Sequence, residues 1–175
     1  MNQQNELEQW IESADKNSMP ERLERLKQLR DHYDRDHGIL FYGGYIPARA
    51  FEEMQFCYIH GSYISCVLAA QVVLEHMLAA LLEETDCDPA GFGFAKLCDA
   101  ALNEDLISQP EFDRFNVLRR LRNPYTHSQP LMGRSCIIRR VAESMVSPQD
   151  IFKADAESAL ETVIEFISRP PFAVG

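Results

Sequence analysis

The segment from about residue 62 to residue 84 is the most apolar part of the chain, and it constrains the fold more than any other feature. Apolar side chains cover most faces of a helix built over it, which predicts a helix at the centre of a bundle. Its longest apolar run, Val67 to Leu82, carries Gln71, Glu75 and His76. This run is too short and too polar at its centre to predict a membrane span, so we expect no membrane association.

Most of the remaining chain also carries helical spacing of apolar residues. We expect helices over residues 4–15, 20–36, 47–60 and 94–103, one that Pro110 opens and that breaks at Asn123-Pro124, and a last one from Pro148 to about 167. Residues 134–146 fit a helix or an extended segment equally. No segment alternates apolar and polar residues convincingly as a strand would. The sequence therefore predicts an all-α bundle.

Length and cysteine content favour a single-domain cytoplasmic protein. The 175 residues fit one domain, and the chain begins without the basic and apolar pattern of a secretory signal. Its five cysteines are an odd number without Cys-x-x-Cys spacing, which predicts reduced thiols rather than disulfides or a zinc site. The histidines outside the motif described below lack ligand spacing too, so we expect neither a metal nor a cofactor.

Charge is distributed unevenly along the chain. The formal net charge is −10, which argues against a protein that coats nucleic acid non-specifically. Residues 114–140 nevertheless hold seven arginines and no acidic residue, so this segment is at +7 and the rest at −17 (10 basic minus 27 acidic residues). These arginines either pair with acidic helices or form a confined anion-binding patch, and both can hold for different arginines.

The candidate site is the segment Arg122-Asn123-Pro124-Tyr125-Thr126-His127. In one uninterrupted helix Arg122 and His127 would lie roughly 140° apart and would not share a face. Pro124 disfavours the helical conformation at Asn123, so we expect the helix to stop there, with Asn123 capping the next turn. Such a break would bring the guanidinium and the imidazole together.

An adjacent arginine and histidine suit RNA cleavage without a metal. The histidine can take a proton from the internal 2′-hydroxyl nucleophile, while the arginine stabilises the charged phosphorane. Asn123 would orient the phosphate or only cap a helix. The candidate substrate-binding residues are Arg119, Arg120, Tyr125 and Thr126. The spacing by itself is common, and its other interpretation is a surface arginine beside a histidine whose hydrogen bonds are satisfied.

Three stretches together resemble the HEPN superfamily. They are Gly61-Ser62-Tyr63 leading into the apolar helix, the run from Leu97 to Ser108, and Leu121-Arg122-Asn123 followed three residues later by His127. The resemblance spans about residues 47–167. It implies a four- to five-helix bundle, a homodimer that brings two Arg/His pairs together, and metal-independent ribonuclease activity in toxins or defence. Members partnered by a nucleotidyltransferase antitoxin often end the motif in His-x-Tyr, and His127-Ser128-Gln129 lacks that tyrosine.

Glu75 is the second feature of interest. On a helical wheel it falls among Ile64, Leu68, Gln71, Leu78 and Leu82, in the middle of an apolar face. A carboxylate there needs a partner, because an isolated buried charge is costly. The resemblance implies a polar residue on this helix near the Arg/His site. Either Glu75 pairs with Arg122 or positions His127, or it forms a structural ion pair with another arginine such as Arg119.

We therefore predict an N-terminal helical extension, residues 1–46, and a HEPN-like helical bundle, residues 47–175. The first hypothesis is a cytoplasmic, homodimeric, metal-independent endoribonuclease acting as a toxin or in defence. In it, His127 is the general acid or base, Arg122 the transition-state stabiliser and Asn123 the orienting group, with Glu75 in support. RNA is the substrate, and an antitoxin or another protein is a further candidate partner. The alternative is a non-catalytic HEPN-like interaction module whose acidic surface binds a protein.

The loop that precedes residue 47 holds three aromatic side chains beside a pair of glycines: Phe41, Tyr42 and Tyr45. Aromatic rings can stack on the bases of single-stranded RNA. They can equally fill one end of the bundle, which is the interpretation we favour.

Overall fold

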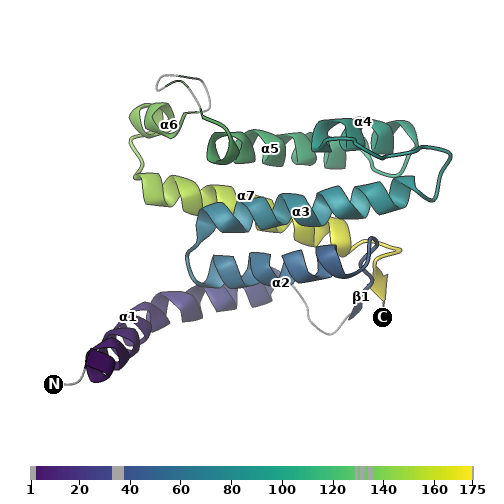
Figure 1. Ribbon diagram of the computed structural model, residues 1–175. Coiled ribbons are helices and arrows are strands. Elements are labelled where there is room, and N and C mark those ends of the chain that lie inside the picture. The colour runs from purple at the N-terminus through teal and green to yellow at the C-terminus, as the bar shows by residue number, and fades with distance from the viewer. Residues whose placement is uncertain (1–2, 33–37, 129, 131–132, 134–135, 175) are drawn as a thin grey trace.

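The computed structural model describes the chain except for residues 1–2, 33–37, 129, 131–132, 134–135 and 175. The described part is almost entirely helical (Figure 1). Its elements are α1 (Gln3–His32), β1 (Gly38–Ile39), α2 (Tyr45–Ile59), α3 (Tyr63–Leu82), α4 (Phe94–Asn103), α5 (Gln109–Thr126), α6 (Ile137–Ser144), α7 (Pro148–Ile167) and β2 (Ala173–Val174). The predicted all-α class is confirmed.

The apolar helix α3 is the centre of the bundle, as predicted. It contacts α2, α7, α4 and α5, which lie around it in Figure 1. Eleven of its residues are buried, among them Val67, Leu74 and Met77, because apolar side chains occupy most of its faces. By length and apolarity alone α3 would pass as a membrane span, and half of its most apolar window is buried inside the fold.

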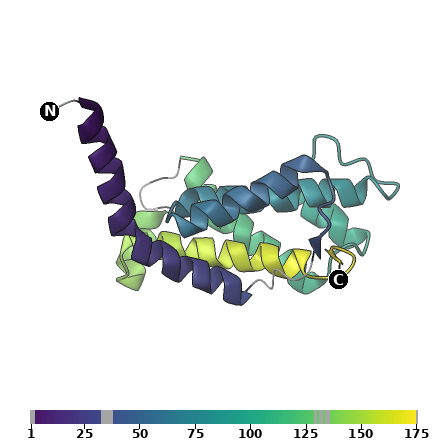
Figure 2. The ribbon, with the colours of Figure 1, turned by 90° about the horizontal axis from the view of Figure 1, so that it is seen from below.

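The N-terminal region forms one helix where two were predicted. Residues 3–32 are continuous, and Pro20, expected to open a second helix, lies inside α1. The proline removes the backbone N–H that would bond to the carbonyl of Lys16. The hydrogen bonds of the neighbouring turns carry the helix through, and α1 changes direction along its length (Figure 2). Residues 33–36, predicted as helix, lie outside the described part.

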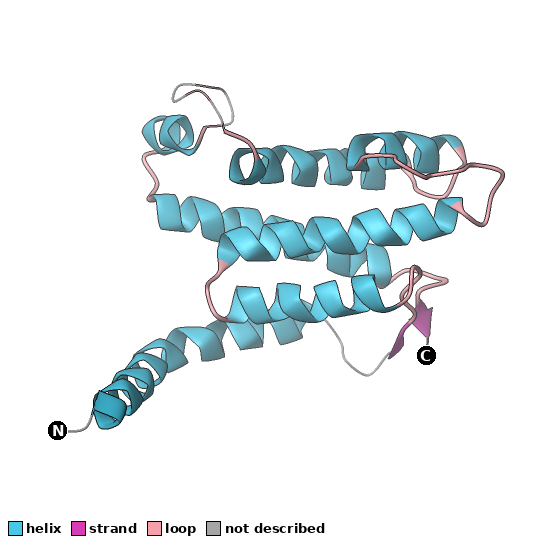
Figure 3. Cartoon of the chain, viewed as in Figure 1, coloured by secondary structure: helices cyan, strands magenta, loops and turns pink. Residues whose placement is uncertain are grey.

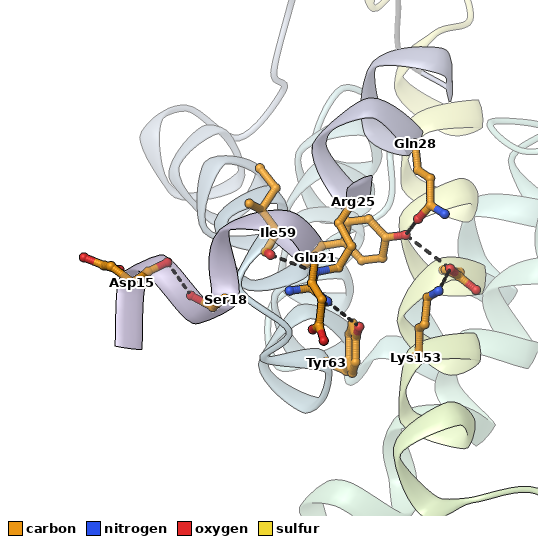
Figure 4. A network of polar contacts seen from close by, with 10 residues as sticks. Asp15, Ser18, Glu21, Arg25, Gln28, Ile59, Tyr63 and Lys153 are labelled. Atoms are coloured by element: carbon orange, nitrogen blue, oxygen red, sulfur yellow. Dashed lines mark hydrogen bonds and ion pairs between the residues drawn. The ribbon is translucent and has the colours of Figure 1, made fainter. Parts of the chain in front are cut away.

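Buried polar contacts join the second half of α1 to α2, α3 and α7. Arg25 is 8% exposed and donates to the carbonyl of Ile59 (2.8 Å) and to the hydroxyl of Tyr63 (3.2 Å). The Tyr58 hydroxyl lies 2.8 Å from Gln28 and 3.2 Å from a carboxylate of α7. Figure 4 shows the side chain of Arg25, on α1, reaching Ile59 and Tyr63 on either side of the turn from α2 to α3. This half of α1 is therefore part of the packed bundle.

The aromatic loop before α2 fills one end of the bundle with two of its three rings. Phe41 packs on Phe51 with the ring centroids 5.4 Å apart, and Tyr42 packs edge-on against Phe172 at the same distance. Tyr45 is 94% exposed. The C-terminal end of the chain reaches the segment just before this loop, because β1 pairs antiparallel with β2 (Figure 3). Each of these strands is two residues long, which is too short to show an alternation of apolar and polar residues.

Capping residues mark the starts of α5 and α7. Ser108 and Glu111 form a capping box at the start of α5, and the Ser147 side chain accepts from the backbone N–H of Asp150 at the start of α7. The ambiguous segment 134–146 contains the helix α6, while its residues 134–135 lie outside the described part.

Two buried thiols predict how stability changes with pH. Burial raises the pKa of Cys66 above the usual 9.0 and, with a smaller effect of Asp99, raises that of Cys98 to about 12. The unfolded chain releases these protons near pH 9.0, whereas the folded chain keeps them. Stability is therefore fully present below pH 9.0 and is lost as pH rises toward 12.

We expect the free energy of unfolding, measured by urea titration in a reducing buffer, to fall steadily over this range. The variant Cys98→Ala should show a shallower fall, because it lacks one of the protons involved. Equal slopes for the two proteins would contradict the assignment to Cys98.

Candidate active site

The helix that carries the candidate site does not break at Pro124. Helix α5 runs to Thr126, and Pro124 lies inside its last turn. The predicted cap at Asn123 is therefore wrong. A proline this close to a helix end costs one hydrogen bond, to the carbonyl of Arg120, and two more residues after it stay helical. The helix stops instead at His127, whose backbone is extended (φ −125°, ψ 134°) and whose N–H bonds to the carbonyl of Asn123.

Arg122 and His127 do meet, by this different route. Because His127 leaves the helix, the angular separation of an unbroken helix no longer applies. Arg122 Nη1 lies 3.1 Å from His127 Nε2. Arginine has no acceptor, so this contact is a hydrogen bond only when the imidazole is neutral and carries its proton on Nδ1. The guanidinium is partly exposed and the imidazole is exposed, so a ligand can reach both.

Two further groups of the motif converge on the same guanidinium nitrogen. Arg122 Nη1 donates to Thr126 Oγ1 at 3.1 Å and lies 3.4 Å from Asn123 Oδ1. The Thr126 hydroxyl is also 3.4 Å from the carbonyl of Asn123, which is a weak contact. Four residues of the predicted site thus form one cluster at the end of α5. Its four members are Arg122, Asn123, Thr126 and His127.

The arginines of the arginine-rich segment divide into paired and unpaired residues. Three arginines are neutralised by carboxylates: Arg114 by Glu165, Arg139 by Glu143 and Arg140 by Asp155. Arg119, Arg120 and Arg122 have no carboxylate within ion-pair distance among the described residues. Arg134 lies outside the described part. The unpaired positive charge is therefore concentrated on the last three turns of α5, beside the Arg/His pair.

Tyr125 is used by the fold. Its hydroxyl donates to Asp155 Oδ2 at 2.5 Å, and Arg140 binds both oxygens of that carboxylate at 2.6 Å. Asp155 is 2% exposed, and the contact with it raises the pKa of Tyr125 further, beyond the larger effect of burial. This cluster ties the end of α5 and helix α6 to α7. It positions the backbone that carries His127, which favours a structural role for the tyrosine over direct substrate binding.

Asp155 and Arg140 are the residues that the sequence analysis did not single out. A signal for Asp155 was present, because it lies beside Phe152, Ala156 and Ala159 on the apolar stripe of the last helix. A carboxylate on such a stripe needs a buried partner. The identity of that partner was hidden, because Arg140 is fifteen residues away and belongs to the segment whose structure was ambiguous.

Glu75 makes a side-chain hydrogen bond within its own helix. It is partly exposed, and its carboxylate accepts from Gln71 Nε2 at 3.1 Å, with no hydrogen bond to Arg122 or His127 among the described residues. Glu75 and Arg119 act with opposite signs on the pKa of the Cys98 thiol, so both lie near that side chain. The two charges lie in the same region without forming an ion pair, so neither role predicted for Glu75 is seen as a direct contact.

The structure contains a second contact between an arginine and a histidine, which can be compared with the Arg122–His127 contact. At the end of α2, Arg22 Nη1 lies 3.4 Å from His60 Nε2, and this histidine is also exposed and caps a helix. Arg22 is bound to the carboxylate of Asp15 at 3.3 Å. An arginine already paired with a carboxylate is a weaker phosphate ligand. Arg122, without such a partner among the described residues, is the better one.

The fold and the site define an all-helical protein with an exposed Arg/Asn/Thr/His cluster at the end of a core helix. No family model, curated protein or solved structure matches the chain. Among the described residues, no group of three or more histidine, cysteine, aspartate or glutamate side chains is placed to hold a metal ion.

The Asp155 cluster predicts a graded loss of stability. Tyr125→Phe should lower the free energy of unfolding by about 2 kcal/mol, the usual contribution of a hydrogen bond to a charged group. Asp155→Ala should cost about 3 kcal/mol, because it leaves Arg140 and Tyr125 without their partner. Tyr45→Phe, whose side chain is 94% exposed, is the matched control and should change nothing. Urea unfolding measures all three, and a Tyr125→Phe value equal to the control would contradict the role given to this hydroxyl.

Proposed function

We propose that this chain is a metal-independent endoribonuclease of HEPN type, cytoplasmic and homodimeric, acting as a toxin or in defence. The observation that carries the proposal is the 3.1 Å contact between Arg122 and His127 on an exposed helix end, at an arginine with no carboxylate partner among the described residues. Five free cysteines fit a reducing compartment.

The proposed reaction begins with a phosphate of RNA binding to Arg122. This phosphate competes with His127 for the guanidinium and frees the lone pair of Nε2. The imidazole then takes the proton of the adjacent 2′-hydroxyl, and the 2′-oxygen attacks phosphorus. Arg122, with Asn123 and Thr126 as its neighbours, stabilises the phosphorane. The 5′-oxygen leaves with a proton from the imidazolium, or from its counterpart in a second copy, and a 2′,3′-cyclic phosphate remains.

The alternative proposal is a non-catalytic interaction module. The observations that favour it are the net charge of −10 and the exposed apolar side chains near the N-terminus, such as Trp10 at 71%. Such a surface suits binding to another protein, an antitoxin included. In this proposal the Arg122–His127 contact only closes the end of α5.

The test is cleavage of a labelled RNA of mixed sequence in the presence of EDTA. We expect the unmodified protein to cleave and to leave a 2′,3′-cyclic phosphate. His127→Ala and Arg122→Ala should each lower the rate by roughly 100-fold or more, the usual contribution of a general base or an oxyanion-stabilising group. His60→Ala is the matched control, because it removes an exposed histidine that also contacts an arginine at a helix end.

Three results bear on the choice between the two proposals. Cleavage that survives His127→Ala points to a contaminating nuclease. An equal loss in His127→Ala and His60→Ala means that neither histidine is specific to the reaction. No cleavage by the unmodified protein at high concentration favours the interaction module.

The supporting role of Glu75 has its own test. If Glu75 acts on the Arg/His pair, Glu75→Gln should shift the pH profile of cleavage while the free energy of unfolding changes little. If it balances Arg119, the variant should lower stability and leave the pH profile in place. A variant unchanged in cleavage, pH profile and stability would exclude both roles.

A further inference from the structure

The first half of α1 is an amphipathic helix whose apolar face is open to solvent. Leu7, Trp10 and Ile11 are 60%, 71% and 54% exposed. Figure 2 shows this part of α1, residues 3–18, extending away from the bundle. We call it the α1 arm. Exposing three neighbouring large apolar side chains to water is unfavourable, and such patches usually mark a site of interaction.

The exposed face of the arm repeats the face that the rest of α1 packs on the bundle. An α-helix of 3.6 residues per turn completes five turns in 18 residues. The differences 25 − 7, 28 − 10 and 29 − 11 are all 18, so Leu7, Trp10 and Ile11 have the same positions in the helical repeat as Arg25, Gln28 and Leu29. Those later residues contact the bundle, Leu29 being 1% exposed. The arm therefore presents a more apolar version of a face that is already built for packing.

The negative charge of the arm makes some binding partners less favourable than others. Residues 3–18 hold four acidic side chains and one lysine, a net charge of −3 (1 − 4). Two arms packed on one another would bring like charges together. An anionic membrane surface would repel the arm as well. The favoured partner is a surface that is both cationic and apolar.

Exposed side chains of both kinds lie on α5 and α6 of this same chain, two helices that each bind Asp155 of α7. On α6 and the loop after it, Ile138, Met145 and Val146 are 55%, 88% and 40% exposed. Arg120, on α5, is exposed and has no carboxylate partner among the described residues. We call these four side chains the α5–α6 end. They offer apolar side chains against which Leu7, Trp10 and Ile11 can pack, and a positive charge that complements the net negative charge of the arm.

We propose that the α1 arm of one copy binds the α5–α6 end of a second copy. The exchange is reciprocal, so a symmetric dimer buries both arms and doubles every contact. Leu7, Trp10 and Ile11 pack on the exposed apolar residues of α6, while the acidic face of the arm lies near Arg120. This inference concerns assembly and does not rest on the cleavage of RNA.

Trp10 makes the proposal directly measurable, because it is the only tryptophan of the chain. In a monomer its fluorescence should resemble that of a solvent-exposed indole. In the dimer it should shift to the blue as protein concentration rises, in step with the mass measured by light scattering. Added salt should move both transitions to higher concentration, because it screens the charges.

Pairs of matched variants test the contributions of the α1 arm and of the α5–α6 end separately. Leu7→Glu should abolish the dimer, whereas Leu23→Glu, in the same helix and similarly exposed at 52%, should leave it intact. Arg120→Glu should weaken the dimer by roughly tenfold, and Arg49→Glu, on α2, should not. Combining Arg120→Glu with the arm reversal Glu8→Arg and Glu12→Arg should restore it. Circular dichroism checks that each variant is folded.

Each other outcome overturns the proposal in a recognisable way. A monomer at every concentration, with exposed Trp10 emission, means that the arm has no partner in a second copy. A blue-shifted emission that is independent of concentration means that the arm folds back on its own chain. A dimer that Leu7→Glu abolishes and Arg120→Glu leaves unchanged means that the arm binds elsewhere, as in arm-to-arm pairing.

Discussion

The burial of α3 is the constraint on which the rest of the structure depends. An apolar helix of twenty residues has to be covered on most sides, and α2, α4, α5 and α7 cover it. Each of these helices therefore needs one apolar face, and its remaining surface is free for charge. On α5 that free surface ends in arginines. The position of the candidate site is in this sense a consequence of packing: the helix that brings Leu118 into the core carries Arg119, Arg120 and Arg122 alongside.

The end of α5 is an unfavourable place for an anion unless side chains supply the charge. Carbonyl groups at a helix C-terminus carry partial negative charge, which favours arginine there and disfavours phosphate. Arg122 is thus stabilised by its own helix, and a phosphate can be held only by its guanidinium and its neighbours. The Tyr125–Asp155–Arg140 cluster adds rigidity, because it holds the last turn of α5 against α7 just before the chain turns at His127.

The sequence predicted the helices well and their interruptions poorly. Apolar spacing located α2, α3, α4 and α7 to within a few residues, because packing against a common core is what creates that spacing. The two wrong breaks were both placed at prolines, Pro20 and Pro124. A proline removes one hydrogen bond, and the packing of Leu29 and of Leu118 on either helix outweighs that loss. Local propensity yielded to tertiary contacts that a single sequence does not display.

The contact between Arg122 and His127 was predicted for the wrong reason, because the sequence does not show the local backbone conformation that brings the two side chains together. The break at Pro124 was expected to bring the two side chains together, whereas the end of the helix at Thr126 does so. Spacing indicates that two residues can meet, and it does not indicate what surrounds them. Arg22 and His60 meet with no recognisable spacing at all, thirty-eight residues apart. What separates the two pairs is Asp15, whose carboxylate neutralises Arg22 and has no counterpart at Arg122 among the described residues. Whether the arginine of an Arg/His pair is free to bind a ligand therefore depends on a third residue, which only the fold reveals.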